Sequence, residues 1–382
     1  MPERQQDTRA LDPEVSPLDA EDLRSRVHKV LEEFLDRQVG TLEEVSSDCI
    51  PMVEHIADLM RGGKRLRPAF CYWGWRAAGG QDCADIVTAA SALEFFQAAA
   101  LIHDDVMDDS DTRRGLPAVH RRFAAIHAGA GWTGEGDRFG QAGAILAGDL
   151  CLVWSDELFA ASGLVDDGTA GRRGRRIFDQ MRTELMAGQY LDMLEQAIAA
   201  QRVSAGADAT DAVERARRVI RYKSAKYTIE QPLLIGGALA GADEALLASY
   251  AAFGLPLGEA FQLRDDVLGV FGDPERTGKP AGDDLREGKR TVLVAAALGR
   301  ATPAAAATLE RLLGDPNLDA AGVETARTIL HDSGGVAYVE QLIDQLTGQA
   351  RSALAAVSTD RLAAPARIVL EALVDAATDR TT

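Results

Sequence analysis

Two stretches of the sequence gather aspartates at helical spacing. In HDDVMDDSDTRRG, Asp104 and Asp108 are four residues apart and share one face of a helix, with Asp105 one position round. Adjacent carboxylates repel one another unless cations lie between them, and Mg²⁺ uses one or two carboxylates completed by water and phosphate oxygens. An apolar run precedes Asp104 and should carry the cluster into the protein interior. We therefore predict a Mg²⁺ site here. The alternative is a set of solvated aspartates at a helix C-terminus, where the macrodipole disfavours them.

The second stretch mixes acids with bases. Asp265 and Asp266 lie within one helical turn of Gln262, and DDVLG at 265–269 echoes DDVMD at 104–108. Such a mixture suits a site that holds a metal and a phosphate together, because lysine supplies a mobile point charge while the metal bridges oxygens. A Gly-rich segment follows and adds Lys279, Asp283, Asp284, Lys289 and Arg290.

Two basic elements could bind an anion. GGKRLRP at 62–68 places its basic side chains after two glycines, which let the backbone approach a ligand closely. Lys64 and Arg67 are three residues apart and share a face, with Arg65 between them. The alternative is an ordinary helix start that happens to carry three basic residues. RYKSAKYT adds a smaller group of basic and hydroxyl side chains, at Lys223, Ser224 and Lys226.

These residues need helices to position them, and the composition favours helices. Hydrophobic residues make up 46% of the 382 residues, and β-branched runs with period-two alternation are rare. No linker separates two domains, so we predict an all-α fold, a single large bundle of long helices over 19–378, after a disordered segment at 1–18. The expected helices are 20–39, 43–62, 65–78, 84–110, 117–128, 139–162, 172–200, 210–240, 243–272, 290–300, 303–313, 318–333, 335–357 and 361–377.

The overall charge excludes several partners. A net charge of −18 repels phosphate backbones and anionic lipid headgroups, so we expect neither nucleic-acid nor membrane-surface binding. The stretch 86–102 is apolar but shorter than a membrane span, and a helix buried in the bundle explains it better. The polar N-terminus lacks a signal-peptide pattern, and the four cysteines show no C-x-x-C spacing, so we predict a cytoplasmic protein without disulfides or a zinc site.

The order of these motifs resembles that of the trans-isoprenyl diphosphate synthases, the polyprenyl synthetase family, and most of all its geranylgeranyl diphosphate synthases. The series is GGKRLRP, HDDVMDDSDTRRG, GQYLD, KSAKYT, FQLRDDVLG and GKPAGDDLREGK, and it covers residues from about 55 to 292. Each motif alone has modest specificity, but the ordered series is hard to obtain by chance. The resemblance implies a helical bundle around a deep apolar cavity, with the two aspartate motifs facing each other at its mouth, and usually a homodimer.

The resemblance also implies a role for each matching residue. Asp104, Asp105 and Asp108 would bind two Mg²⁺ ions, and Asp265, together with Asp266 and Asp284, would bind a third. The isopentenyl diphosphate would be held by Gly63, Lys64, Arg67, Gln97 and Arg114. The allylic diphosphate would be held by Arg113, Lys223, Ser224, Gln262, Lys279 and Lys289.

One position departs from the family's pattern. The second aspartate motif commonly ends in aspartate, and here Gly269 stands in that place. Asp273 could compensate only if its helix continues past Gly272, which the Gly-Asp-Pro sequence disfavours. We therefore expect Asp265 to be the principal metal ligand of this motif.

The chemistry expected of this family fits the residues. Mg²⁺ and basic side chains would neutralise the leaving diphosphate as the allylic C–O bond breaks. The isopentenyl double bond would then attack the carbocation, and the departed diphosphate would accept the proton, because no histidine or carboxylate stands out as a base. His103 is expected to be structural or outer-shell. The enzymatic alternative is a class I terpene cyclase, which needs no second diphosphate site, and the non-enzymatic one is a regulatory subunit, which typically has eroded motifs.

Product length should depend on the helix that carries Asp104. Each turn descends about 5.4 Å, close to one isoprene unit. Ala99 and Ala100 lie one turn below Asp104 and leave room for a growing chain, whereas Phe95 and Phe96 lie two turns below. Phe96 is eight residues from Asp104 and points in nearly the same direction, so we predict that it forms the floor for a twenty-carbon product. The alternative is that both phenylalanines only pack the core.

Overall fold

The protein is a bundle of helices, as predicted from its composition. The computed structural model describes residues 17–166, 168–204, 209–272, 282–362 and 364–378. The helices include α1 (Leu23–Val45), α2 (Ile50–Met60), α3 (Leu66–Ala77), α4 (Ala84–Met107), α5 (Val119–Ala130), α6 (Gly136–Ala161), α7 (Gly168–Ser204), α8 (Ala209–Val219) and α10 (Glu244–Phe271). The rest are α9 (Gln231–Leu239), α12 (Asp283–Arg286), α13 (Val292–Leu298), α14 (Pro303–Leu312), α15 (Ala320–Asp332), α16 (Gly335–Ala356) and α17 (Ala364–Thr378), with short 3₁₀ turns at Pro17–Asp22, Ser47–Cys49 and Leu164–Asp166.

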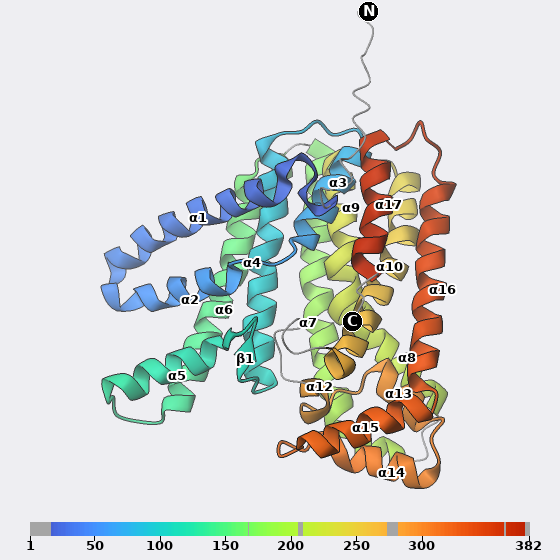
Figure 1. The fold of residues 1–382 in the computed structure, drawn as a ribbon. Helices are drawn as coiled ribbons and strands as arrows, with labels where there is room; N and C mark the ends of the chain where they lie inside the picture. Colours follow the sequence, from blue (N-terminus) through green and yellow to red (C-terminus); the bar gives the residue numbers. More distant parts are fainter. Residues whose placement is uncertain (1–16, 167, 205–208, 273–281, 363, 379–382) are drawn as a thin grey trace, which may run out of the picture.

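The long helices α4, α6, α7, α10 and α16 run side by side, and α1, α2 and α5 project to one side of them (Figure 1). Helices α13, α14 and α15 close the lower end in this view, and α17 descends toward the middle of the molecule. One buried cluster contains residues from each of α1–α7 and from α9 and α17. A second contains residues from α8, the C-terminal half of α10 and α13–α16. Both clusters pack against α10, so this helix connects the two halves of the bundle.

The helix that carries the first aspartate motif is a core helix. Helix α4 is, among the described residues, the one helix long and apolar enough to cross a membrane, yet 72% of its most apolar window is buried in the protein. It packs most extensively against α6. Its burial holds the aspartates at its C-terminal end in a fixed place within the bundle.

The structure departs from the predicted helix at 210–240 in one respect that matters for the site. The chain forms α8, then an 11-residue π-helical segment, Ile220–Glu230, and then α9. The segment lies between two helices at close range. A Cβ on Gly188 of α7 would lie 2.6 Å from the carbonyl carbon of Tyr222, and a Cβ on Gly258 of α10 would lie 2.6 Å from the carbonyl oxygen of Ala225. These glycines allow the π segment to sit between α7 and α10.

Two small elements were not expected from the sequence. Strands β1 (Thr112–Arg113) and β2 (Leu116–Pro117) form a short antiparallel hairpin after α4, and α12 is a single turn after α10. The segment at 1–16, most of the predicted disordered terminus, lies outside the described residues, and the described chain begins with a 3₁₀ turn at Pro17–Asp22.

Candidate functional site

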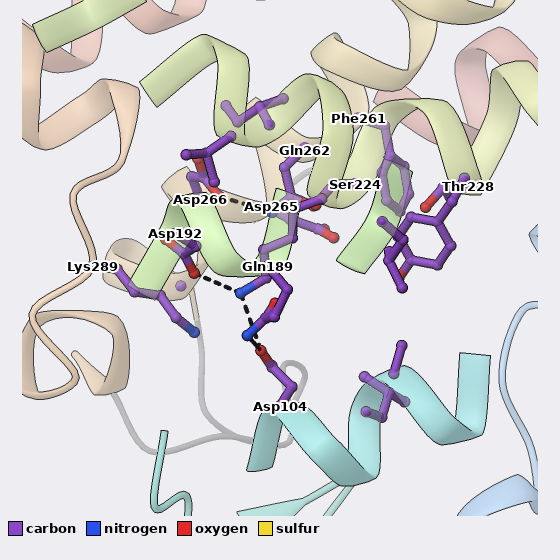
Figure 2. Close-up of a pocket in the computed structure, with 18 of the residues that line it drawn as sticks. Asp104, Gln189, Asp192, Ser224, Thr228, Phe261, Gln262, Asp265, Asp266 and Lys289 are labelled. Atoms are coloured by element: carbon purple, nitrogen blue, oxygen red, sulfur yellow. Dashed lines mark hydrogen bonds and ion pairs between the residues drawn. The ribbon is translucent and has the colours of Figure 1, made fainter. Parts of the chain in front are cut away.

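The two aspartate motifs and both basic elements border one cavity. It has a volume of about 790 Å³ and is lined by side chains from α3, α4, α7, the π segment, α10 and the segment that follows α10. Asp104 extends from the end of α4 toward Gln189 and Asp192, whereas Gln262, Asp265 and Asp266 approach from the opposite wall (Figure 2). The predicted convergence of the two motifs is therefore present in the fold.

Basic side chains and one amide surround the carboxylate of Asp104. Its Oδ1 accepts hydrogen bonds from Nζ of Lys223 at 3.0 Å and Nε2 of Gln189 at 2.9 Å, and Nη2 of Arg113 lies 3.5 Å from its Oδ2. Burial alone would raise the pKa of Asp104, but the ammonium groups of Lys223 and Lys289 outweigh it and hold the pKa below its usual range. Asp104 therefore stays ionised and can bind a cation.

The other two aspartates of the motif are placed differently from Asp104. Asp105 is buried and accepts a hydrogen bond from Nε of Arg113 at 2.8 Å, and neither Asp105 nor Asp108 lines the cavity. Asp108 caps α4, and its buried Oδ2 has no hydrogen-bond partner among the described residues; Nζ of Lys289 is 3.6 Å away. Burial and the neighbouring Asp104 raise the pKa of Asp108 to about 6. Asp104, which lines the cavity, is therefore the strongest ligand candidate of the three, and Asp108 one turn on offers an oxygen without a hydrogen bond from the described residues.

The second motif places two aspartates on the opposite wall of the cavity. Asp265 and Asp266 both line it, and Asp266 accepts a hydrogen bond from Nε2 of Gln262 at 2.8 Å. Burial raises the pKa of Asp266 to about 8, with contributions from Asp284 and Asp265. Helix α10 ends at Phe271, and the predicted residues Asp273 and Lys279 lie outside the described residues.

Lys289 connects the two motifs. Its Nζ lies 3.4 Å from Oδ1 of Asp284, 2.5 Å from Oε2 of Glu287 and 3.6 Å from Oδ2 of Asp108. Burial would lower the pKa of Lys289, but these carboxylates raise it well above its usual value, so the ammonium stays charged. A single lysine thus faces acids from both sides of the cavity mouth.

The first basic element divides its side chains between the cavity and the core. Lys64 and Arg67 line the cavity, and Arg67 donates a hydrogen bond to Oγ1 of Thr228 at 2.7 Å. The guanidinium of Arg67 also lies over the ring of Tyr227, whose hydroxyl donates to Oε1 of Gln97 at 2.8 Å. These contacts fix Arg67 and Gln97 on one wall.

Arg65 points away from the cavity instead. It is buried, forms an ion pair with Glu94 of α4 and donates a hydrogen bond to the carbonyl oxygen of Met60 at 2.7 Å. Arg114 lies behind the same loop, where it donates to the carbonyl oxygen of Leu59 at 2.7 Å and would contact a Cβ on Gly63. The two arginines hold the glycine loop from behind.

Some residues that line the site were not predicted from the sequence to do so. Gln189 and Asp192 belong to GQYLD, and their i, i+3 spacing on α7 places both on the face toward Asp104. Nζ of Lys223 lies 2.6 Å from Oδ2 of Asp192. That spacing was visible in the sequence, but without a fold nothing showed that α7 faces α4 here. Thr228 and Phe261 line the cavity without having had a distinctive sequence signal.

Of the four residues predicted to set product length, one lines the cavity and three do not. Ala100 lines the cavity, whereas Ala99 is fully buried and does not. Phe96 lies edge-on to Tyr227, with ring centroids 6.2 Å apart, so it supports a cavity wall from behind. Phe95 faces away, where its ring contacts Phe34 at 5.0 Å and Trp154 at 5.9 Å.

The carboxylates and basic side chains that line the cavity suit a hard divalent cation that also binds phosphate. Within the described part of the chain, no three His, Cys, Asp or Glu side chains gather closely enough to hold a metal by themselves. The cavity instead presents carboxylates from two walls, and the buried Oδ2 of Asp108 lacks a hydrogen bond. Mg²⁺ typically takes one or two carboxylates and completes its shell with water and substrate phosphate oxygens. The residues present therefore suit Mg²⁺ arriving with a diphosphate.

Sequence and structure comparisons with known proteins find the same family of enzymes. The family model of polyprenyl synthetase matches residues 51–330. A nonaprenyl diphosphate synthase from Mycobacterium tuberculosis is 31% identical over 353 residues, covering 92% of each chain. A geranylfarnesyl diphosphate synthase from Aeropyrum pernix is 32% identical over 300 residues, covering 78% of this chain and 84% of its own. The structure is similar to that of a geranylgeranyl pyrophosphate synthase from Corynebacterium glutamicum, complexed with isoprenyl diphosphate and magnesium, with a TM-score of 0.86, 39% identity and coverage of 94% and 98%.

Proposed function

Because this chain belongs to the polyprenyl synthetase family, as the order of its motifs predicted, we propose that it condenses isopentenyl diphosphate with an allylic diphosphate, head to tail, to give geranylgeranyl diphosphate. The observation that carries the proposal is the convergence of three groups on one cavity. Asp104 and Asp265 come from facing helices, and Lys64 belongs to a separate basic wall. Two anionic substrates and a metal can thus meet in one place.

The aspartates are proposed to hold the cation. Asp104 and Asp108, with Asp105 behind them, would bind two Mg²⁺ ions, and Asp265, with Asp266 and Asp284, would bind a third. Bound Mg²⁺ would supply electrostatic stabilisation of the diphosphate leaving group. The described side chains support this assignment because Asp104 is held as an anion and both walls offer carboxylate oxygens, which Mg²⁺ prefers as ligands.

The basic side chains are proposed to hold the two diphosphates. Lys64 and Arg67, with Gln97, Gly63 and Arg114, would bind isopentenyl diphosphate. The opposite set would bind the allylic diphosphate, and its members are Arg113, Lys223, Ser224, Gln262, Lys289 and Lys279, of which Lys279 lies outside the described residues. Lys and Arg side chains suit both substrates because their charge-assisted hydrogen bonds are strong where water is excluded.

The proposed reaction breaks one bond and forms another. The allylic C1–O bond breaks, and the electron pair leaves with the diphosphate that Lys223 and Arg113 face. The isopentenyl double bond then forms a carbon–carbon bond to the allylic cation. A proton leaves the adjacent carbon to make the new allylic double bond, and the released diphosphate accepts it. Apolar side chains such as Leu101, Leu185 and Phe261 line the cavity and would keep water from the cation.

The relatives named above are synthases of products of different lengths, so the product length proposed for this chain is argued from its cavity. A twenty-carbon product is supported by Ala100, whose small side chain lines the cavity, and by the wall that Tyr227 and Phe96 form together. A shorter or longer polyprenyl diphosphate is the alternative.

The assembly is proposed to be a cytoplasmic homodimer. Helices α6 and α7 expose apolar side chains that a second copy would cover. On α6, Leu146 and Val153 are 56% and 62% exposed, and on α7 Tyr190 is 64% exposed. Exposed apolar side chains gathered on helices typically mark protein interfaces.

A product analysis tests the proposed function. The purified chain is incubated with MgCl₂, labelled isopentenyl diphosphate and, in turn, dimethylallyl, geranyl or farnesyl diphosphate, and products are identified by mass spectrometry. We expect labelled geranylgeranyl diphosphate from each primer. Another chain length would overturn the product assignment alone, and the absence of any labelled prenyl diphosphate would overturn the proposed function.

A further inference from the structure

Glu259 is a buried acid of α10 that the proposed reaction does not use. It is 2% exposed and does not line the cavity, although Gln262 and Asp266 on the same helix do. Burying a carboxylate is costly unless it is paired and fully hydrogen-bonded. A buried charge within two turns of the second aspartate motif therefore calls for an explanation.

Hydrogen bonds from two arginines satisfy both oxygens of this carboxylate. Oε2 accepts from Nε and Nη2 of Arg217 at 3.3 and 2.9 Å, and Oε1 accepts from Nε and Nη2 of Arg221 at 3.1 and 3.0 Å. Arg217 belongs to α8 and Arg221 to the π segment, and neither lines the cavity. One carboxylate of α10 therefore binds α8 and the π segment together, on the side away from the cavity.

Helix α10 holds the π segment at a second place beside the first. A Cβ on Gly258 would lie 2.6 Å from the carbonyl oxygen of Ala225, so the two backbones are in close contact there. Glu259 thus pairs with the residue two before Lys223, and Gly258 contacts the residue two after it. Lys223 lies midway between these contacts, and its ammonium group donates a hydrogen bond to Asp104.

A π segment of this length needs support from other elements. Hydrogen bonds from residue i to i+5 are rare in proteins and usually form a single turn, whereas this segment runs for 11 residues. An α-helix has fewer residues per turn, so relaxation to an α-helix would change the directions of the side chains along the segment. Contacts that prevent this relaxation therefore also fix the direction of Lys223.

From these contacts we infer that Glu259 is a positioning residue, which fixes the π segment on α10 through Arg221 and thereby holds Lys223 in place. The inference rests on the proposed function, in which Lys223 binds the allylic diphosphate. Ser224 of the π segment and Gln262 of α10, two further proposed ligands of that diphosphate, lie across the cavity from the end of α4 (Figure 2). Glu259 thus sets the register between the two segments that form the allylic site.

Two simpler roles predict different results on substitution. If Glu259 only stabilised the fold, Glu259→Gln would lower the unfolding temperature, and the folded protein would bind a diphosphate as before. If the acid acted only through its charge, its removal would leave two arginines unopposed and would tighten the binding of an anion. Under our inference the variant binds a diphosphate less tightly, and the size of the loss depends on Lys223.

The test is a double-mutant cycle on binding. Calorimetric titration with inorganic pyrophosphate in MgCl₂ measures the affinity of the wild type, Glu259→Gln, Lys223→Ala and the double variant. We expect Glu259→Gln to weaken binding about tenfold in the wild-type background and less than about twofold in the Lys223→Ala background, because residues of one network couple this strongly. Arg221→Gln should behave as Glu259→Gln does, and it carries the test if the latter does not fold. Thermal unfolding verifies that each variant is folded.

Glu340→Gln is the matched control. Glu340 of α16 accepts hydrogen bonds from Arg264 of α10 at 2.6 and 2.8 Å, so the variant removes a similar ion pair from the same helix on its α16 side. It should leave the pyrophosphate affinity unchanged. The inference is overturned if folded Glu259→Gln binds pyrophosphate as tightly as the wild type or more tightly, or if it loses the same factor in both backgrounds. If the wild-type chain shows no Mg²⁺-dependent pyrophosphate binding, the proposed function fails, and the inference fails with it.

Discussion

Nζ of Lys223 lies 3.0 Å from Oδ1 of Asp104 and 2.6 Å from Oδ2 of Asp192. This one ammonium group joins the π segment, α4 and α7 at the cavity. Both carboxylates raise the pKa of Lys223 against the effect of burial, so the cation is retained. A lysine therefore neutralises, in the protein alone, the aspartate that we propose as a metal ligand.

The central role of Asp104 and Asp108 predicts a large loss of activity in the double alanine variant. Removal of a single group that stabilises transition-state charge typically costs about 10²–10³ in kcat, and we expect at least that here. Circular dichroism should show an unchanged helical content. Asp111→Ala is the matched control, because that carboxylate is in the same stretch but 82% exposed. Near-normal Mg²⁺-dependent turnover in the double variant would refute the metal-ligand assignment.

Much of the fold and the central site follow from the sequence. The apolar run before Asp104 and the turn signals around it predicted a buried helix at 84–110, and α4 spans Ala84–Met107. The expected cavity between two aspartate motifs is also confirmed. Helical spacing assigns residues to a common face, so the faces of long helices could be predicted well.

Other features depend on contacts that spacing does not specify. Arg65 lies between two cavity residues in sequence, yet its side chain pairs with Glu94 in the core. The carboxylate of Asp105 similarly accepts a hydrogen bond from Arg113 instead of lining the cavity. The π segment depends on glycines of two other helices, and the place of Asp284 depends on Gly269. Such pairings join residues distant in sequence, and no periodic pattern identifies the partner.

Glu94 is expected to act on isopentenyl diphosphate through Arg65. Glu94 is 5% exposed and does not line the cavity, but its partner Arg65 lies between Lys64 and Arg67. We predict that Glu94→Gln raises the KM for isopentenyl diphosphate about tenfold, with a smaller change in the KM for the allylic substrate, because a misplaced loop loses charge-assisted hydrogen bonds.

Simple electrostatics predicts the opposite sign for this variant, because removing a carboxylate from a basic region should favour an anion. An unchanged or lower KM for isopentenyl diphosphate would thus contradict the positioning role. Breaking a buried ion pair costs about 3–5 kcal/mol, so urea unfolding must accompany the kinetics. Glu94→Asp is the conservative comparison and should recover part of the affinity.

Product length can be tested from the wall that Ala100 forms. A phenylalanine at position 100 would project into the cavity, so Ala100→Phe should shift the product from twenty toward fifteen carbons. Phe96→Ala removes the support behind Tyr227 and should shift the product toward twenty-five carbons or more. Mass spectrometry of the prenyl diphosphates measures both effects. Unchanged product length in both variants would show that another helix forms the floor.

The burial of His55 predicts that the protein loses stability in acid. Its side chain on α2 is 7% exposed, neither ring nitrogen has a hydrogen-bond partner among the described residues, and burial together with nearby Arg122 lowers its pKa to about 4. The unfolded chain binds the proton at a higher pH than the folded chain does, at about 6.5. The stabilising contribution is therefore complete above about pH 6.5 and is lost as the pH falls toward 4.

His55→Leu should remove this part of the pH dependence. Between about pH 7.5 and pH 5 the histidine accounts for about 2 kcal/mol of the decrease in unfolding free energy. Urea unfolding at the two pH values should show a decrease smaller by that amount in the variant than in the wild type. An equal decrease in both proteins would show that His55 does not resist protonation in the folded state.

The central claim is that the cavity joins two diphosphate substrates, and the dependence of allylic diphosphate consumption on isopentenyl diphosphate tests it most directly. With MgCl₂ present, we predict consumption of geranyl diphosphate only when isopentenyl diphosphate is added, with one pyrophosphate released for each isopentenyl unit incorporated. Equal consumption of geranyl diphosphate without isopentenyl diphosphate, with a hydrocarbon as product, would contradict the account and indicate a class I terpene cyclase.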